Sequence, residues 1–277
     1  MPDERSRAET SPAPEEDLRR ELSRLRGRLT RSDEQRERMT AELELLRAAT
    51  RYPFGDDLPE SVEEVVARVR QERLTYLRAE DLRALAALVG EIERSGREGQ
   101  IIEAGTALGG SAIVLAAAKS RERPMAVYDV FGMIPEPSER DPEAVHARYR
   151  QIVSGRSSGI GDDTYYGYRE DLLGEVYASF DRLGVAAPEH RVELVAGLFE
   201  DTLHVEGPVA LAHLDGDWYD STMVCLERVA PQLVRGGRIV LDDYYYWDGS
   251  RQATQDFFAA RPEFRIEHRA KAHVVRL

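Results

Sequence analysis

Segments with strand character and segments with helix character alternate along residues 60–277, and this alternation restricts the chain to an α/β architecture. Short apolar runs bounded by glycine, proline or charged residues predict strands, and apolar residues at helical spacing predict helices. The predicted strands are 101–105, 125–130, 191–197, 209–215, 238–243, 264–269 and 272–277. Helices are predicted from Ser61 onward and over 79–94, 109–119, 143–152, 169–182, 220–234 and 250–260.

Strands that alternate with helices pair in parallel through right-handed crossovers. The connection between the last two predicted strands is too short for a crossover, so these two strands should pair antiparallel. We therefore expect a mostly parallel seven-stranded sheet with an antiparallel strand at one end. Ligands of such sheets bind at the carboxyl ends of the strands, where the polar motifs described below fall.

The first fifty residues have a different pattern from the rest. Leu18, Leu22, Leu25 and Leu29 are spaced by 4, 3 and 4 residues, and this phase continues to Leu46 with interruptions. The pattern predicts a helical extension over residues 1–50, which either self-associates as a coiled coil or stays a solvated arm. Two prolines and a glycine in residues 51–60 mark a boundary, so the second predicted domain is 51–277. A homo-oligomer is the expectation.

Composition limits the expected cellular location and the expected classes of partner. The chain has 277 residues, a formal net charge of −13 and one cysteine, Cys225. A single cysteine excludes an internal disulfide and any zinc site built from several cysteines, and a cytoplasmic location is the default. With no run of 18 apolar residues and no apolar signal core, we expect no membrane span. The acidic balance argues against nucleic acid as a partner.

A glycine-rich turn follows the first predicted strand and precedes a helix. The segment from Glu103 to Ser111 contains Gly105, Gly109 and Gly110 in a spacing that departs from G-x-G-x-x-G, the dinucleotide pattern. Such a turn either brings backbone N–H groups close to a ligand or serves packing alone, and both interpretations stay open here. Asp129 closes the second strand, where an acidic residue commonly holds a ribose or else caps a turn.

Four aspartates follow two later strands. Asp215 and Asp217 end the strand 209–215, and Asp242 and Asp243 end the strand 238–243. If these strands are neighbours, the carboxylates converge, and two of them ~4 Å apart repel by roughly 4 kcal/mol at an effective dielectric near 20. Oxygen ligands without cysteine indicate a hard divalent cation, with Mg²⁺ first and Ca²⁺ or Mn²⁺ as alternatives. One aspartate could then remain free to accept a proton.

Neighbouring residues are open to more than one interpretation. His213 lies in a strand expected to be buried, so we interpret it as structural. Cys225 falls on the apolar face of a helix and is expected in the core. The run Tyr244–Trp247 either lines a substrate pocket or packs a loop.

The assembled motifs resemble those of the macrocin O-methyltransferase family. The matching segments are EAGTALGGSA, YDVFGMIPEP, LVAGLFEDTL, HLDGDWYDST and GGRIVLDDYYYWDGSRQATQDFF, within about residues 70–277. The resemblance implies a Rossmann-like class I methyltransferase fold. It also implies methyl transfer from S-adenosylmethionine, with Mg²⁺, to a sugar hydroxyl of an antibiotic or related natural product. A small glycosylated acceptor is the implied partner. The loop after the second strand, FGMIPEPSERD, departs from the family in detail.

Residue roles follow from the same resemblance. It implies that Asp215, Asp242 and Asp243 hold Mg²⁺ and that Asp217 is the general base. It implies cofactor contacts at Tyr76, Leu77, Glu103, Gly105, Ser111, Asp129, Leu198, Phe199 and Asp215. Residues 132–142 and 154–164 would form a lid.

Three other functions compete with this one. A nicotinamide-dependent sugar oxidoreductase would require the G-x-G-x-x-G spacing, which is absent here, and would have no need for a metal. A catechol-type O-methyltransferase shares the sheet, donor and metal site but acts on a phenol. A non-enzymatic scaffold would leave the aspartates and the glycine turn unexplained.

Overall fold

The computed structural model describes residues 58–277, so the predicted N-terminal coiled coil lies outside the described residues. The chain forms a seven-stranded sheet in the order β3-β2-β1-β4-β5-β7-β6. The strands are β1 (Gln100–Ala104), β2 (Met125–Asp129), β3 (Val192–Ala196), β4 (Val209–Leu214), β5 (Leu233–Leu241), β6 (Phe264–His268) and β7 (Ala272–Arg276). β7 pairs antiparallel with both β5 and β6, and the other described strand pairs are parallel, which confirms the predicted mostly parallel sheet.

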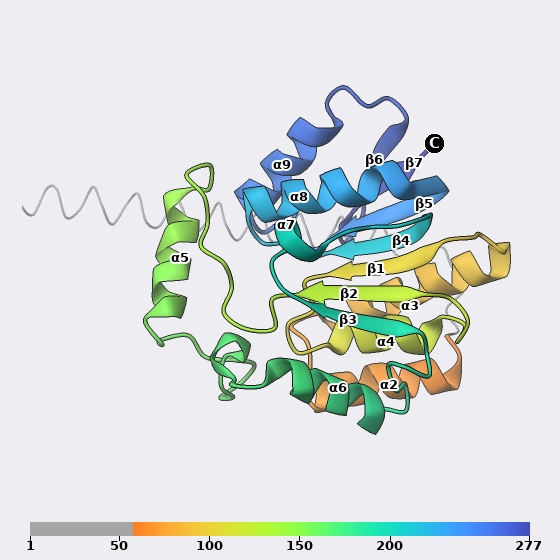
Figure 1. The fold of residues 1–277 in the computed structure, drawn as a ribbon, viewed down its shortest axis with the longest axis horizontal. Coiled ribbons are helices and arrows are strands. Elements are labelled where there is room, and N and C mark those ends of the chain that lie inside the picture. The colour runs from red at the N-terminus through yellow and green to blue at the C-terminus, as the bar shows by residue number, and fades with distance from the viewer. Residues whose placement is uncertain (1–57) are drawn as a thin grey trace, which may run out of the picture. The chain divides into compact units, whose positions relative to one another are not determined.

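Helices cover both faces of the sheet (Figure 1). On one face lie α2 (Glu60–Gln71), α3 (Ala79–Ser95), α4 (Gly110–Ala118) and α6 (Leu172–Arg182). On the other lie α7 (Phe199–Thr202), α8 (Tyr219–Val229) and α9 (Asp248–Phe258). Each layer buries its own apolar cluster against the sheet, one around Ile101 and Phe180 and the other around Ile102 and Leu226. Cys225 lies fully buried in the second cluster, as predicted.

The remaining helix, α5 (Glu143–Val153), stands beside the carboxyl ends of the strands in Figure 1. It contributes to a third apolar cluster with Ile134, Tyr165 and Trp218. This cluster links the predicted lid segment 132–142, through Ile134, to the start of α8, and none of its members lies in the other predicted lid segment, 154–164. The segment 132–142 therefore packs where ligands of parallel sheets bind.

Two boundaries differ from the prediction. The helix expected over 220–234 ends at Val229 and is followed by a 3₁₀ turn, Ala230–Gln232, so β5 begins at Leu233 rather than Arg238. Gly236, with φ of +72°, lies inside β5 near a register shift against β4, and this irregularity hid the start of the strand. The short helix α7 was not predicted. Within residues 58–277, no helix combines the length and apolar character needed to cross a bilayer.

Candidate active site

The glycine turn between β1 and α4 is held by the carboxylate of Asp129. The backbone N–H groups of Thr106 and Ala107 donate to Asp129 Oδ2 at 2.7 and 2.9 Å, and Phe131 N–H donates to Oδ1 at 2.7 Å. Burial raises the pKa of Asp129 and outweighs these three amides, which act in the opposite direction. Asp129 therefore joins the end of β2 to the turn after β1.

A pocket of about 550 Å³, including its opening to solvent, lies next to this turn. Predicted site residues on its wall are Gly105, Asp129, Leu198, Phe199, Asp215 and Asp217. The pocket therefore connects the turn after β1, the end of β2, the start of α7 and the aspartates after β4. Ile134, Pro135 and Tyr166 from the lid region complete the wall. Sequence analysis did not single out Tyr166, and only its place in the aromatic run 165–168 could have suggested it.

Four predicted cofactor residues are not on this wall. Glu103 is fully buried, with one carboxylate oxygen accepting from the Ser111 hydroxyl and the other facing His213 Nδ1 at 3.2 Å. Tyr76 is half exposed and makes an edge contact with the ring of Tyr166 at 6.3 Å. Leu77 is buried beside a different, smaller cavity.

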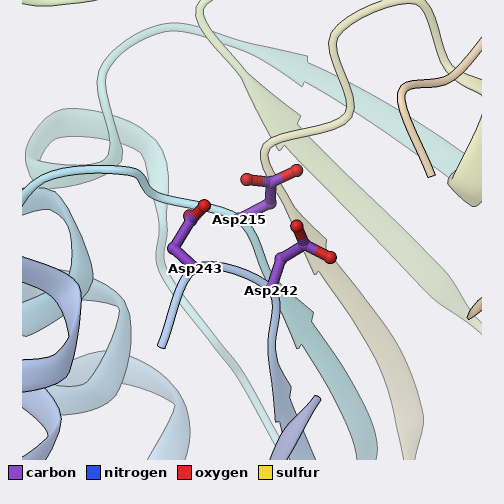
Figure 2. A group of neighbouring side chains, drawn as sticks. All are labelled: Asp215, Asp242 and Asp243. Carbon is purple, nitrogen blue, oxygen red and sulfur yellow. The ribbon is translucent and has the colours of Figure 1, made fainter. Parts of the chain in front are cut away.

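Asp215, Asp242 and Asp243 converge where β4 and β5 end (Figure 2). Each offers one oxygen, and these oxygens lie within 4.8 Å of one another. The pairing of β4 with β5 brings them together, since Asp242 N–H donates to the Leu214 carbonyl at 2.9 Å. Burial and the neighbouring carboxylates raise the pKa of Asp215, and the same causes raise the pKa of Asp243 to about 6. Three convergent, mutually repelling carboxylates fit a hard divalent cation.

Asp217 lies beside this group without being one of the three. Its backbone adopts the left-handed region, with φ of +55°, and its N–H donates to Asp243 Oδ2 at 2.8 Å. Burial, followed by the charges of Asp243 and Asp242, raises its pKa well above the ordinary value. The alternative role as a helix cap is not observed, because Trp218 is the N-cap of α8 and no side chain caps it. Backbone strain of this kind costs of order 1–3 kcal/mol and is common at functional sites.

His213 has a more specific place than the structural role we predicted. It is 1% exposed and lies between two carboxylates, with Nε2 3.4 Å from Asp242 Oδ1 and Nδ1 facing Glu103. Burial alone would lower its pKa, but the two carboxylates outweigh it and raise the pKa to about 10. Lys271, at the start of β7, contacts the same oxygen of Asp242 at 2.7 Å. Neither contact could be read from the sequence.

None of the four aromatic residues after β5 is among those that line the pocket described above, which favours the predicted packing role. Tyr244 is buried in the core beneath α9, whereas Tyr246 is 55% exposed. Trp247 contacts Trp218 edge to face at 5.7 Å, and Trp218 Nε1 donates to the Pro135 carbonyl at 3.0 Å. These tryptophans connect the aspartate-bearing loops to the predicted lid segment 132–142.

The seven-stranded sheet is that of the class I methyltransferases, and the following comparisons show that the chain is an S-adenosylmethionine-dependent O-methyltransferase. Among solved structures, the chain is similar to the O-methyltransferase NovP, with a TM-score of 0.60 and 21% identity over 86% of this chain and 98% of that one. It is also similar to CalS11, a calicheamicin methyltransferase, with a TM-score of 0.52 and 19% identity over 83% and 96%. At these identities the likeness shows the fold.

The sequence model of the macrocin-O-methyltransferase (TylF) family matches residues 19–267, and the chain belongs to this family. A relative from Streptomyces olivaceus is 31% identical over 210 residues, which are 74% of this chain and 70% of the relative. It is the 8-demethyl-8-(2,3-dimethoxy-alpha-L-rhamnosyl)-tetracenomycin-C 4'-O-methyltransferase. The mycinamicin III 3''-O-methyltransferase of Micromonospora griseorubida is 29% identical over 54% of this chain and 57% of that protein.

Proposed function

We propose that this protein transfers a methyl group from S-adenosylmethionine to a sugar hydroxyl of a glycosylated natural product, with Mg²⁺ at the aspartates and Asp217 as general base. One observation carries the proposal. Asp215 and Asp217 line the same pocket as Gly105 and Asp129, so a donor group and an acceptor activated by carboxylates would meet in one space. The names of two relatives support a sugar acceptor. One is a 4'-O-methyltransferase of a rhamnosyl compound, and the other is a 3''-O-methyltransferase.

The donor would lie along the pocket from the turn after β1 to the start of α7. Asp129 would hold the ribose, and Leu198 and Phe199 would flank the adenine. Gly105 would contact the methionine end, with Glu103 and Ser111 supporting the turn from beneath. Tyr76 and Leu77 would close over the donor from the segment before α3.

Asp215, Asp242 and Asp243 would hold Mg²⁺. Their oxygens lie within 4.8 Å of one another, and the pKa values of Asp215 and Asp243 are raised, which supports this assignment. When bound, the cation lowers the pKa of an acceptor hydroxyl. Asp217 then accepts the hydroxyl proton on its carboxylate, and its constrained backbone and the bond to Asp243 orient it for this task. The pocket walls align the acceptor oxygen with the S–CH₃ bond and exclude water. The charge of the sulfonium is neutralised as the methyl group moves.

Calorimetric titration with S-adenosylmethionine, S-adenosylhomocysteine and NADH at constant Mg²⁺ tests the donor. We expect both adenosyl ligands to bind and NADH not to bind, and a ligand at 100 times its Kd should add about 2.7 kcal/mol to the free energy of unfolding. Binding of NADH alone would overturn the proposal.

A panel of glycosylated and catechol acceptors, each with and without a chelator, tests the acceptor. We expect methylation of sugars that stops when the cation is removed. Methylation of catechols alone would replace this proposal with the phenolic alternative.

Association and location stay predictions. A homo-oligomer through residues 1–50 predicts a sedimentation coefficient above that of a monomer at micromolar concentration, and a monomer there would contradict it. A cytoplasmic location would appear in cell fractionation.

A further inference from the structure

The two oxygens of the Asp242 carboxylate have different surroundings. Oδ1 receives both cationic neighbours, Lys271 Nζ at 2.7 Å and His213 Nε2 at 3.4 Å. Oδ1 is the nearer of the two oxygens to each of these groups. Oδ2 is therefore the less engaged oxygen of Asp242 and the more available one for a cation.

Both neighbours of Oδ1 are themselves fixed. His213 is buried and held from its other side by Glu103 Oε2 at 3.2 Å, its cross-strand partner on β1. Lys271 is 8% exposed, also donates to the Asp242 carbonyl at 3.1 Å, and lies 4.9 Å from the centre of the Tyr246 ring. The antiparallel pairing of Leu241 with Ala272 sets Lys271 next to Asp242. Rotation of this carboxylate would break contacts to two buried groups.

The number of available oxygens matters for the choice of cation. Ca²⁺ takes six to eight oxygens at flexible geometry and often binds a carboxylate through both oxygens. Mg²⁺ requires near-octahedral geometry with one oxygen from each ligand. A carboxylate limited to one oxygen therefore favours the smaller ion.

We infer that Lys271 and His213 are positioning residues that make Asp242 a one-oxygen ligand and so determine the preference of the site for Mg²⁺ over Ca²⁺. The inference rests on the proposed function, because it takes the three aspartates as the cation site. Neither residue needs to contact the cation. They determine how many oxygens of the Asp242 carboxylate bind the cation.

The ratio of two dissociation constants separates this effect from charge. Removal of a nearby positive charge favours every divalent cation, so it changes the Kd for Mg²⁺ and the Kd for Ca²⁺ in the same direction. Only a change in how Asp242 binds alters their ratio. The measurement is calorimetric titration of the full chain with MgCl₂ and, separately, with CaCl₂, without methyl donor or acceptor.

The test variant is Lys271→Met, which removes the principal donor to Oδ1. We expect the ratio of the Kd for Ca²⁺ to the Kd for Mg²⁺ to fall about tenfold, in line with the effect of residues that orient metal ligands. Lys271→Arg keeps a donor at this position, next to a cavity lined by Asp81, Leu85 and His213. This variant should keep the wild-type ratio.

The matched charge control is Arg269→Met, on the same β6–β7 connection, whose side chain contacts Glu267 Oε2 at 2.8 Å. Its ratio should equal that of the wild type. Equal ratios in Lys271→Met and the wild type, with both cations bound, would overturn the inference and leave the proposed function intact. A wild-type protein that binds neither cation would overturn the metal assignment itself.

A crystal structure of the wild-type protein with Mn²⁺ gives a second test that does not depend on a variant folding. We expect Asp242 to bind Mn²⁺ through Oδ2, with Oδ1 still on Lys271. Binding through both oxygens of Asp242 would overturn the inference.

Discussion

Gly105 and Asp215 are in direct backbone contact across β1 and β4. A Cβ atom on Gly105 would lie 2.0 Å from the carbonyl oxygen of Asp215, and Asp215 N–H donates to the Ala104 carbonyl at 2.8 Å. Gly105 also has φ of +85°. The turn that would hold the methyl donor and the first residue of the cation site are therefore fixed against each other, with no room for a side chain.

Gly105→Ala should lower the melting temperature strongly and abolish binding of S-adenosylmethionine, because the backbone of Asp215 must move. Gly96→Ala is the matched control, since Gly96 has φ of +63° but nothing within 4 Å of the added Cβ. The control should lose about 1–2 kcal/mol of stability through backbone strain alone. Thermal unfolding and calorimetry measure both effects. Equal melting temperatures for the two variants would show that the contact with Asp215 is not limiting.

Asp217→Asn should lower kcat by roughly 10²–10⁴-fold, because an amide cannot take the acceptor proton. The backbone N–H bond to Asp243 Oδ2 is retained in this variant, so the cation site should persist. Steady-state kinetics at saturating donor and acceptor, with the Kd for Mg²⁺ as control, give the measurement. Near-normal turnover would remove Asp217 from the role of base.

Asp129→Asn should weaken binding of S-adenosylmethionine and destabilise the fold by about 2–4 kcal/mol. An amide group would face a backbone N–H group where the carboxylate now accepts bonds from Thr106, Ala107 and Phe131. Asp162→Asn, at an exposed position, is the control for the substitution itself. Denaturant unfolding and donor titration check the two effects, and equal behaviour of the two variants would contradict the prediction.

Glu267→Gln should reduce stability in a pH-dependent way. Burial alone would raise the pKa of Glu267, but bonds from Arg238 and Arg265 outweigh it and lower the pKa from 4.5 to about 2. A folded-state pKa below the unfolded one adds stability that is fully present above pH 4.5 and is lost as pH falls through about 2. The difference in melting temperature between the variant and the wild type should therefore be largest near neutral pH and should disappear in acid. Exposed Glu263→Gln is the control, and a constant difference across pH would contradict the ion-pair origin.

The sequence was sufficient for the sheet and for the four aspartates. Strand ends are read from local apolar runs, and the carboxyl ends of neighbouring parallel strands meet at one edge, so Asp215, Asp217, Asp242 and Asp243 could be grouped in advance. The start of β5 could not be predicted, because Gly236 and the shift in register depend on pairing with β4. His213 and Lys271 were missed as site residues for a similar reason. Their partners lie on β1, β5 and β7, and no local pattern records that proximity.

The position of β7 between β5 and β6 has a consequence for how the protein assembles. β5 pairs with β7, and α9 and β6 lie between these two strands in the chain. Pairing between segments far apart in the chain is slow, and Leu241 with Ala272 is a more local pairing than Ala104 with Leu214. The contact between Lys271 and Asp242 depends on the pairing of β5 with β7, whereas the other aspartates need only β4 and β5. During refolding, the preference for Mg²⁺ over Ca²⁺ should therefore report the moment at which β7 joins β5, separately from the pairing of the other strands.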